Sequence, residues 1–121
     1  MPATPARRAF IVFHLTLGVV VLILSVMALR SAIARRAGGP EHHIAVLAAV
    51  EALSAILFLV PGTLRVGGAG LLLVFAVAAA FHVLRGEFPG PLLIYAAGTV
   101  FVMAHGSAWG RARGAADAPA R

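Results

Sequence analysis

The chain has 121 residues, 61% of them hydrophobic, whereas soluble domains are about 45 to 50% apolar. It contains no cysteine, which excludes disulfides, thiolate metal sites, iron–sulfur clusters and thiol redox chemistry. Ten arginines against four acids give a net charge of +6. Because most of the arginines flank apolar stretches, this charge indicates membrane topology and no nucleic-acid partner. The composition therefore predicts one small integral membrane domain in contact with the lipid bilayer.

Two apolar stretches in the first half of the chain predict membrane-spanning helices. Residues 9–29 would form a helix of about 31 Å, close to the hydrocarbon thickness of a bilayer. Residues 44–60 would form a shorter helix of about 26 Å. This helix is expected to end at Pro61 and Gly62, a strong terminator.

The second half of the chain holds two further apolar stretches. Residues 66–84 open with several glycines, and because no lysine follows them we expect close helix packing and not a phosphate-binding loop. Residues 91–109 start with a proline in the first helical turn and finish with Trp109, a residue type enriched at the membrane interface. Each stretch predicts one more crossing.

The connections between the four stretches are short, which favours antiparallel neighbours. We therefore predict an all-α fold, an integral membrane four-helix bundle with up-down-up-down topology, within residues 9–109. An even number of crossings puts both termini on one side of the membrane. Residues 1–8 and 110–121 are rich in Ala, Pro, Gly and Arg, and we expect both segments to be mobile.

The arginines predict the orientation in the membrane. Six lie on the side of the termini and four on the other, so the positive-inside rule favours cytoplasmic termini. Lysine is absent while Ala, Gly and Arg abound, which is typical of GC-rich bacterial genomes, and we expect a bacterial cytoplasmic (inner) membrane. In an alternative interpretation residues 9–29 are a cleaved signal peptide, but their apolar core is longer than the roughly 7 to 15 residues of such peptides.

Glu51 is the one acid inside an apolar stretch. It lies about 10 Å into the apolar layer, and alanines at helical spacing give it a small-residue face suited to close helix contact. A charged side chain at mid-membrane costs about 3 kcal/mol, so we expect this carboxyl group to have a hydrogen-bond partner or to carry a proton. Glu51 is predicted either to fasten two helices together or to act in proton transfer or ligand contact.

His82 lies near the end of the third stretch, on the side of the membrane where the second stretch starts. At ordinary helix tilts, a contact or a one-water bridge between His82 and Glu51 is feasible. The same end of the bundle gathers four more candidates for a binding pocket: His43, Arg85, Glu87 and Tyr95. The alternative is a set of interfacial residues in contact with headgroups and water.

Histidines at matching depths predict a second kind of site. His14 and His105 lie a few residues inside their stretches at the opposite end, and His14 shares a helix face with Ser25. Either His14 with His105 or His43 with His82 would supply the two axial ligands of a b-type haem. Structural histidines are the favoured interpretation, because two haems need more volume than so short a bundle provides. No other metal site is predicted, since the histidines have no cysteine or clustered carboxylate partners.

Two segments resemble a known family. They are residues 47–53 (Leu-Ala-Ala-Val-Glu-Ala-Leu) with the run into Pro61 and Gly62, and residues 78–87 (Ala-Ala-Ala-Phe-His-Val-Leu-Arg-Gly-Glu). In order and spacing they resemble the DoxX-like family of small four-helix bacterial membrane proteins, over about residues 44–111. The first helix matches only in hydrophobicity. The residues of this chain that fall on positions of the family pattern are Glu51, His82, Arg85 and Glu87.

The resemblance implies a four-helix membrane bundle and a link to redox physiology, since relatives include a subunit of thiosulfate:quinone oxidoreductase and membrane partners of oxidative-stress enzymes. We therefore predict a non-catalytic, accessory membrane subunit of a quinone-linked redox system, with a protein partner and a polar or quinone-binding pocket around Glu51 and His82. One alternative is a bis-histidine b-type haem protein. Another is a small proton-coupled transporter or lipid-handling protein, with Glu51 as the proton-coupled group.

Overall fold

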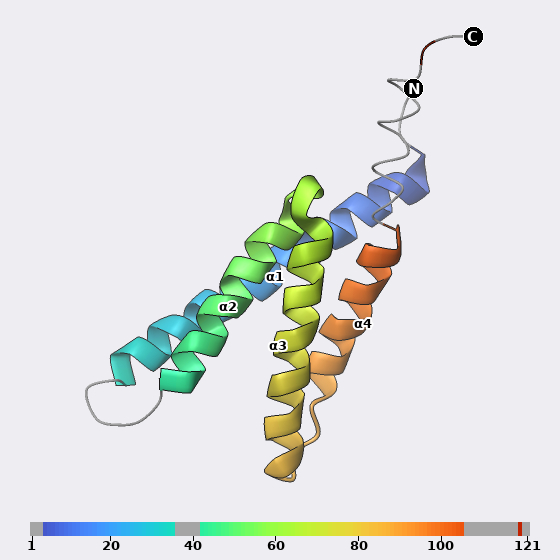
Figure 1. Cartoon of the computed structure of the whole chain (residues 1–121). Helices are drawn as coiled ribbons and strands as arrows, with labels where there is room; N and C mark the ends of the chain where they lie inside the picture. Colours follow the sequence, from blue (N-terminus) through green and yellow to red (C-terminus); the bar gives the residue numbers. More distant parts are fainter. Residues whose placement is uncertain (1–3, 36–41, 106–118, 120–121) are drawn as a thin grey trace.

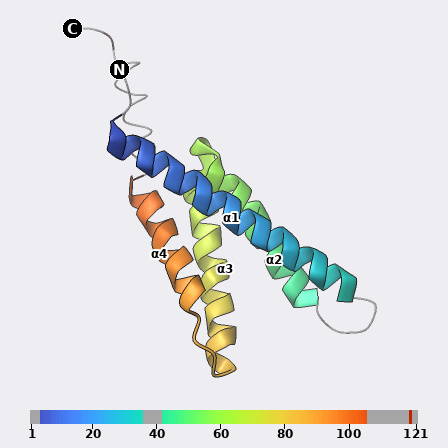
Figure 2. The ribbon, with the colours of Figure 1, turned by 180° about the vertical axis from the view of Figure 1, so that it is seen from behind.

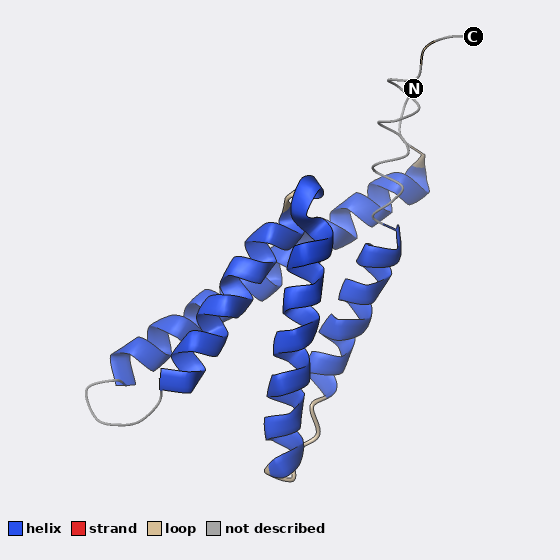
Figure 3. Cartoon of the chain, in the orientation of Figure 1, coloured by secondary structure: helices blue, strands red, loops and turns tan. Residues whose placement is uncertain are grey.

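The computed structural model describes residues 4–35, 42–105 and 119. Its elements are four α-helices and one short 3-10 helix (Figure 1), and Figure 3 shows no strand in this described part of the chain. In chain order they are α1 (Pro5–Arg35), α2 (His42–Leu59), η1 (Pro61–Thr63), α3 (Leu64–Leu84) and α4 (Gly90–His105). The all-α four-helix prediction is confirmed.

The helices have the length and composition of membrane spans. Three segments are long and apolar enough to cross a bilayer: Pro5–Arg35, His42–Leu59 and Pro61–Leu84. The fourth helix, α4, is apolar but has 16 residues, about 24 Å against the roughly 30 Å of the hydrocarbon core. Many large apolar side chains face outward along the helices, as expected of surfaces covered by lipid. The chain is therefore a multi-pass membrane protein.

Helix α1 extends beyond the predicted residues 9–29 at both ends. The amide of Arg7 donates to Thr4 Oγ1 at 3.4 Å, and Pro5 occupies the first helical position, where its missing N–H costs nothing. Residues 5–8, expected in a mobile segment, therefore form the first turn of the helix. Hydropathy marks only the lipid-embedded part of a helix, whereas capping decides where the helix begins. The tail 110–121 lies outside the described residues apart from Pro119.

The helices pack in sequence order, as two antiparallel pairs. Helix α1 lies along α2 and α3 lies along α4, and α2 contacts α3, while α1 touches α4 lightly. Figures 1 and 2 show that α2 and α3 meet at the η1 turn and diverge toward their other ends. The bundle is thus closed at the end of the η1 turn and open at the end where α2 begins and α3 finishes.

Close packing at the closed end depends on glycine. A Cβ atom on Gly67 would lie only 2.6 Å from the backbone carbonyl oxygen of Ser54, so the backbone of α3 rests directly on that of α2. Beside this contact the core is apolar, with Phe58, Leu71 and Phe75 almost fully buried. The predicted role of the glycines after Val66 in close helix packing is confirmed.

Candidate functional site

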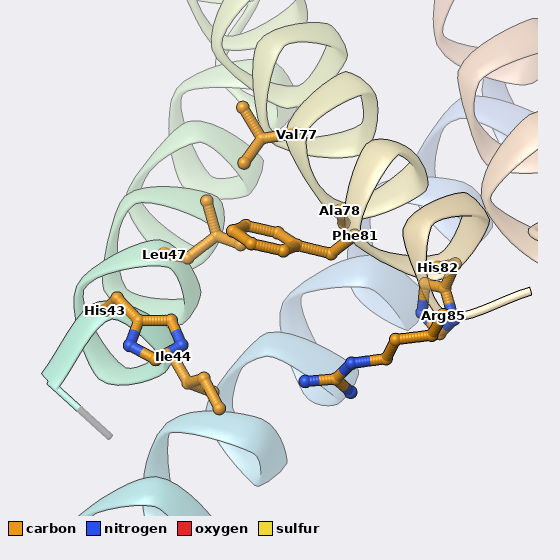
Figure 4. Close-up of a pocket in the computed structure, with 8 residues that line it drawn as sticks. All are labelled: His43, Ile44, Leu47, Val77, Ala78, Phe81, His82 and Arg85. Atoms are coloured by element: carbon orange, nitrogen blue, oxygen red, sulfur yellow. The ribbon is translucent and has the colours of Figure 1, made fainter. Parts of the chain in front are cut away.

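A groove of about 250 Å³ lies between α2 and α3 at the open end of the bundle (Figure 4). Antiparallel packing brings the first turn of α2 and the last turn of α3 to the same membrane face, so the groove is bordered by helix ends that carry polar residues. Of the predicted pocket residues, three line this groove: His43, His82 and Arg85. These three residues come from the two helix ends that the sequence places on one membrane face.

The walls of the groove are apolar. Leu47 comes from α2, and Val77 and Phe81 stand one turn apart on the same face of α3. Figure 4 shows Phe81 extending from α3 toward Leu47, and its ring centroid lies 6.3 Å from that of His43. These wall residues were not among the predicted pocket residues, although the i, i+4 spacing of Val77, Phe81 and Arg85 places all three on one helix face. The groove thus joins a polar mouth to an apolar interior.

The end of α3 is a Schellman motif that fixes the mouth of the groove. Gly86 has a φ of 75°, in the left-handed region that favours glycine. The amide of Glu87 donates to the carbonyl of His82 at 2.9 Å, and the amide of Gly86 donates to that of Val83 at 2.9 Å. These two bonds satisfy carbonyl groups that the helix end would leave unpaired. They also bring the side chains of residues 82 and 87 together.

His82 and Glu87 form a close polar pair across this turn. The Nδ1 atom of His82 lies 2.6 Å from Glu87 Oε2, at the two positions where Schellman motifs commonly have an apolar contact. A carboxylate accepts the proton on Nδ1, and this orients the ring. Within the described part of the chain, Nε2 of His82 has no hydrogen-bond partner. That nitrogen is available to a ligand in the groove.

Arg85 is the cation of the groove. Figure 4 shows its side chain extending from the end of α3 toward α2, where Ile44 and His43 lie. Its guanidinium group has no ion pair or hydrogen bond with any described residue. The described acids are engaged elsewhere, and the other acids, Glu41 and Asp117, lie outside the described residues. The mouth is therefore positively charged within the described structure.

Glu51 lies outside the groove. Its half-buried side chain faces the side chain of Ser25 on α1, its nearest polar neighbour. Ser25 is itself 1% exposed, and its hydroxyl donates to the carbonyl of Val21 at 2.7 Å. The structure does not bring Glu51 and His82 together, because α1 supplies the polar partner at this depth. Glu51 thus connects α1 to α2, in agreement with the interpretation of this residue as a fastening between helices.

Tyr95 also lies apart from the groove. Its ring centroid is 6.2 Å from that of Phe75, and its half-buried side chain packs against the core. Its position in the middle of α4 faces α3, whereas the groove opens on the α2 side of α3. Of the six predicted pocket residues, Glu51 and Tyr95 therefore serve helix contacts, and Glu87 acts through His82.

His14 is a capping group for α2. Pro61 has no amide hydrogen, so the last turn of α2 ends with unpaired carbonyl groups. The hydroxyl of Thr63 donates to the carbonyl of Leu57 at 2.8 Å, and the ring Nε2 of His14 bonds the carbonyl of Phe58 at 2.9 Å. His14 is only 3% exposed, and its ring lies edge-on to that of Phe58. This histidine therefore has a structural role.

The predicted histidine pairs do not fit a b-type haem. Nε2 of His14, the nitrogen an axial ligand would use, is engaged by the backbone, and the ring of Phe10 lies 6.3 Å from His14 and 6.0 Å from His105 between centroids. His105 bonds the backbone of its own helix. At the other end, Phe81 occupies the space beside His43. Among the described residues, no group of three or more His, Asp or Glu could hold another metal ion.

Comparisons with family models, with curated proteins and with solved structures gave no match to this chain.

Proposed function

We propose that this protein is an accessory membrane subunit of a quinone-linked redox system and that the groove between α2 and α3 receives the quinone. One observation carries the proposal: a groove with polar groups at its mouth and apolar walls opens between two membrane-spanning helices. A quinone has the matching form, since it joins a ring with two carbonyl oxygens to a long apolar tail. The likeness of residues 44–111 to DoxX-like proteins supports the same function.

The groove offers complementary chemistry for each part of a quinone. His43 provides a ring N–H that can donate to a carbonyl oxygen. In its imidazolium form His82 can donate from both nitrogens, from Nδ1 to Glu87, which holds the ring in place, and from Nε2 to a carbonyl oxygen. The aromatic ring of Phe81 provides a surface for the quinone ring, and Leu47 and Val77 provide apolar contacts for the start of the tail. The rest of the tail would lie in the bilayer. Chemistry at the quinone itself would belong to the partner protein.

The excess of arginines beside the termini supports an orientation with cytoplasmic termini in a bacterial inner membrane. In that orientation the groove opens in the outer leaflet. A partner that delivers electrons to the quinone from this side would dock beside the end of α3 and the first turn of α2.

A photoreactive quinone tests this proposal directly. We expect an azido-quinone in proteoliposomes to label peptides from the start of α2 and the end of α3, because the groove lies between them. His82→Ala should reduce the labelling severalfold. The matched control is His105→Ala, which removes an exposed histidine at the opposite end. Labelling spread evenly over all four helices, or an equal loss in both variants, would refute quinone binding in the groove.

A further inference from the structure

The charge of the groove mouth is not explained by a quinone. A quinone ring is uncharged, so it can use the histidines and the apolar walls but does not neutralise Arg85. The guanidinium group of Arg85 has no ion pair with a described residue, while Glu87 is held by His82 and Glu51 lies at Ser25 on α1. An anionic group at the mouth would complete this electrostatic arrangement.

We propose that the groove also binds an anionic phospholipid of the bilayer, with its phosphate at Arg85 and His43 and the first part of an acyl chain against Leu47, Val77 and Phe81. The two basic side chains come from opposite walls, and Figure 4 shows the guanidinium group of Arg85 extending toward the side on which His43 lies. A phosphate between them would accept hydrogen bonds from both helices. The phospholipid would therefore join the two helices at the end where they diverge.

The apolar walls favour a lipid over a free anion. Inorganic phosphate or glycerol phosphate would meet Arg85 but would leave Leu47, Val77 and Phe81 uncovered. The mouth also lies where α2 begins and α3 ends, so a phosphate at the helix ends and an acyl chain along the apolar walls fit the two ends of one membrane lipid. An acyl chain and a phosphate on one molecule match both parts of the groove.

This inference goes beyond quinone binding and does not depend on it. A groove of about 250 Å³ accommodates one headgroup or ring at a time, so the two ligands would compete. They differ in the residue on which they depend most. Loss of Arg85 should weaken the phospholipid and spare the quinone, whereas loss of His82 should weaken the quinone more.

Native mass spectrometry of the purified full chain in mild detergent tests the proposal. The protein is titrated with phosphatidylglycerol or phosphatidylcholine of identical acyl chains, and with glycerol phosphate in a third series. We expect preferential binding of phosphatidylglycerol, with affinity reduced about fivefold or more in Arg85→Gln, since one arginine near a membrane surface contributes about a factor of five. Ala78→Phe, which keeps every charge but fills the groove, should reduce binding as well.

Arg30→Gln is the matched control, because Arg30 is an exposed arginine of α1 near the same membrane face and outside the groove. It should retain the preference for phosphatidylglycerol. Equal binding of both lipids, equal losses in Arg85→Gln and Arg30→Gln, or equal binding of glycerol phosphate would overturn the proposal. If phosphatidylglycerol binds as expected while the azido-quinone labels no groove peptide, the proposed quinone function fails and the phospholipid site stands. If the azido-quinone labels the groove peptides while phosphatidylglycerol shows no preferential binding, the phospholipid site fails and the proposed quinone function stands.

Discussion

The two ends of the bundle differ in whether their polar side chains have partners within the protein. At the closed end, His14 and Thr63 bond the last carbonyl groups of α2. At the open end, His43 and Arg85 line a groove, and Nε2 of His82 has no partner among the described residues. Polar side chains in an apolar solvent need hydrogen-bond partners. At the closed end the backbone of α2 provides these partners. At the open end a ligand or the membrane interface would provide them.

The largest expected effect comes from forcing the closed end apart. Gly67→Leu puts a side chain where the backbone of α2 lies, and backbone cannot move aside as a flexible side chain can. We expect a loss of about 3 kcal/mol or more in the free energy of unfolding, measured by titration with a denaturing detergent. Gly62→Ala is the control, because a Cβ there has no neighbour within 4 Å. Equal stability of the two variants would mean that α2 and α3 are not in backbone contact.

The second test removes a backbone cap at the closed end. His14→Leu leaves the carbonyl of Phe58 without its bond from His14, and we expect a loss of about 1 to 3 kcal/mol. His105→Leu removes an exposed histidine that bonds only its own helix, and it should change stability by less than about 0.5 kcal/mol. Both are measured by the same detergent titration. A smaller loss for His14→Leu than for His105→Leu would contradict the capping role.

The smallest expected effect lies at the open end. Glu87→Gln removes the carboxylate that orients His82, but both side chains are about half exposed, so stability should fall by about 0.2 to 1 kcal/mol. The quinone labelling should fall more clearly than the stability, because the His82 ring loses its fixed orientation. The two effects of Glu87→Gln are measured separately, the first by azido-quinone labelling of the α3 peptide and the second by the detergent titration. A stability loss as large as that of His14→Leu would show that this turn is structural and not part of a binding site.

The sequence predicted the helices well because length and hydropathy decide which segments can span a membrane. It predicted their ends less well, since the start of α1 depends on Thr4 and Pro5, outside the apolar stretch. The divergence of α2 and α3 was not foreseen. It reflects direct backbone contact at Gly67 at one end only, and hydropathy does not measure the distance between helices.

The candidate site was predicted in part for a topological reason. Short connections put the start of the second helix and the end of the third on one membrane face, and His43, His82 and Arg85 line one groove there. The partner of Glu51 could not be predicted, because either neighbouring helix could have supplied it. Ser25 on α1 supplies it in the structure, and no spacing within the second helix indicates that choice.

The most direct test of the difference between the ends is a pair of spin-label distances. The chain has no cysteine, so labels can be attached at unique positions. One variant carries labels at the exposed positions Val46 and Val83 near the open end, and a second carries them at Ile56 and Val66 near the closed end. Double electron–electron resonance should give a clearly longer distance between labels at Val46 and Val83 than between labels at Ile56 and Val66. Equal distances in the two variants would mean parallel helices and would contradict a bundle closed at one end and open at the other.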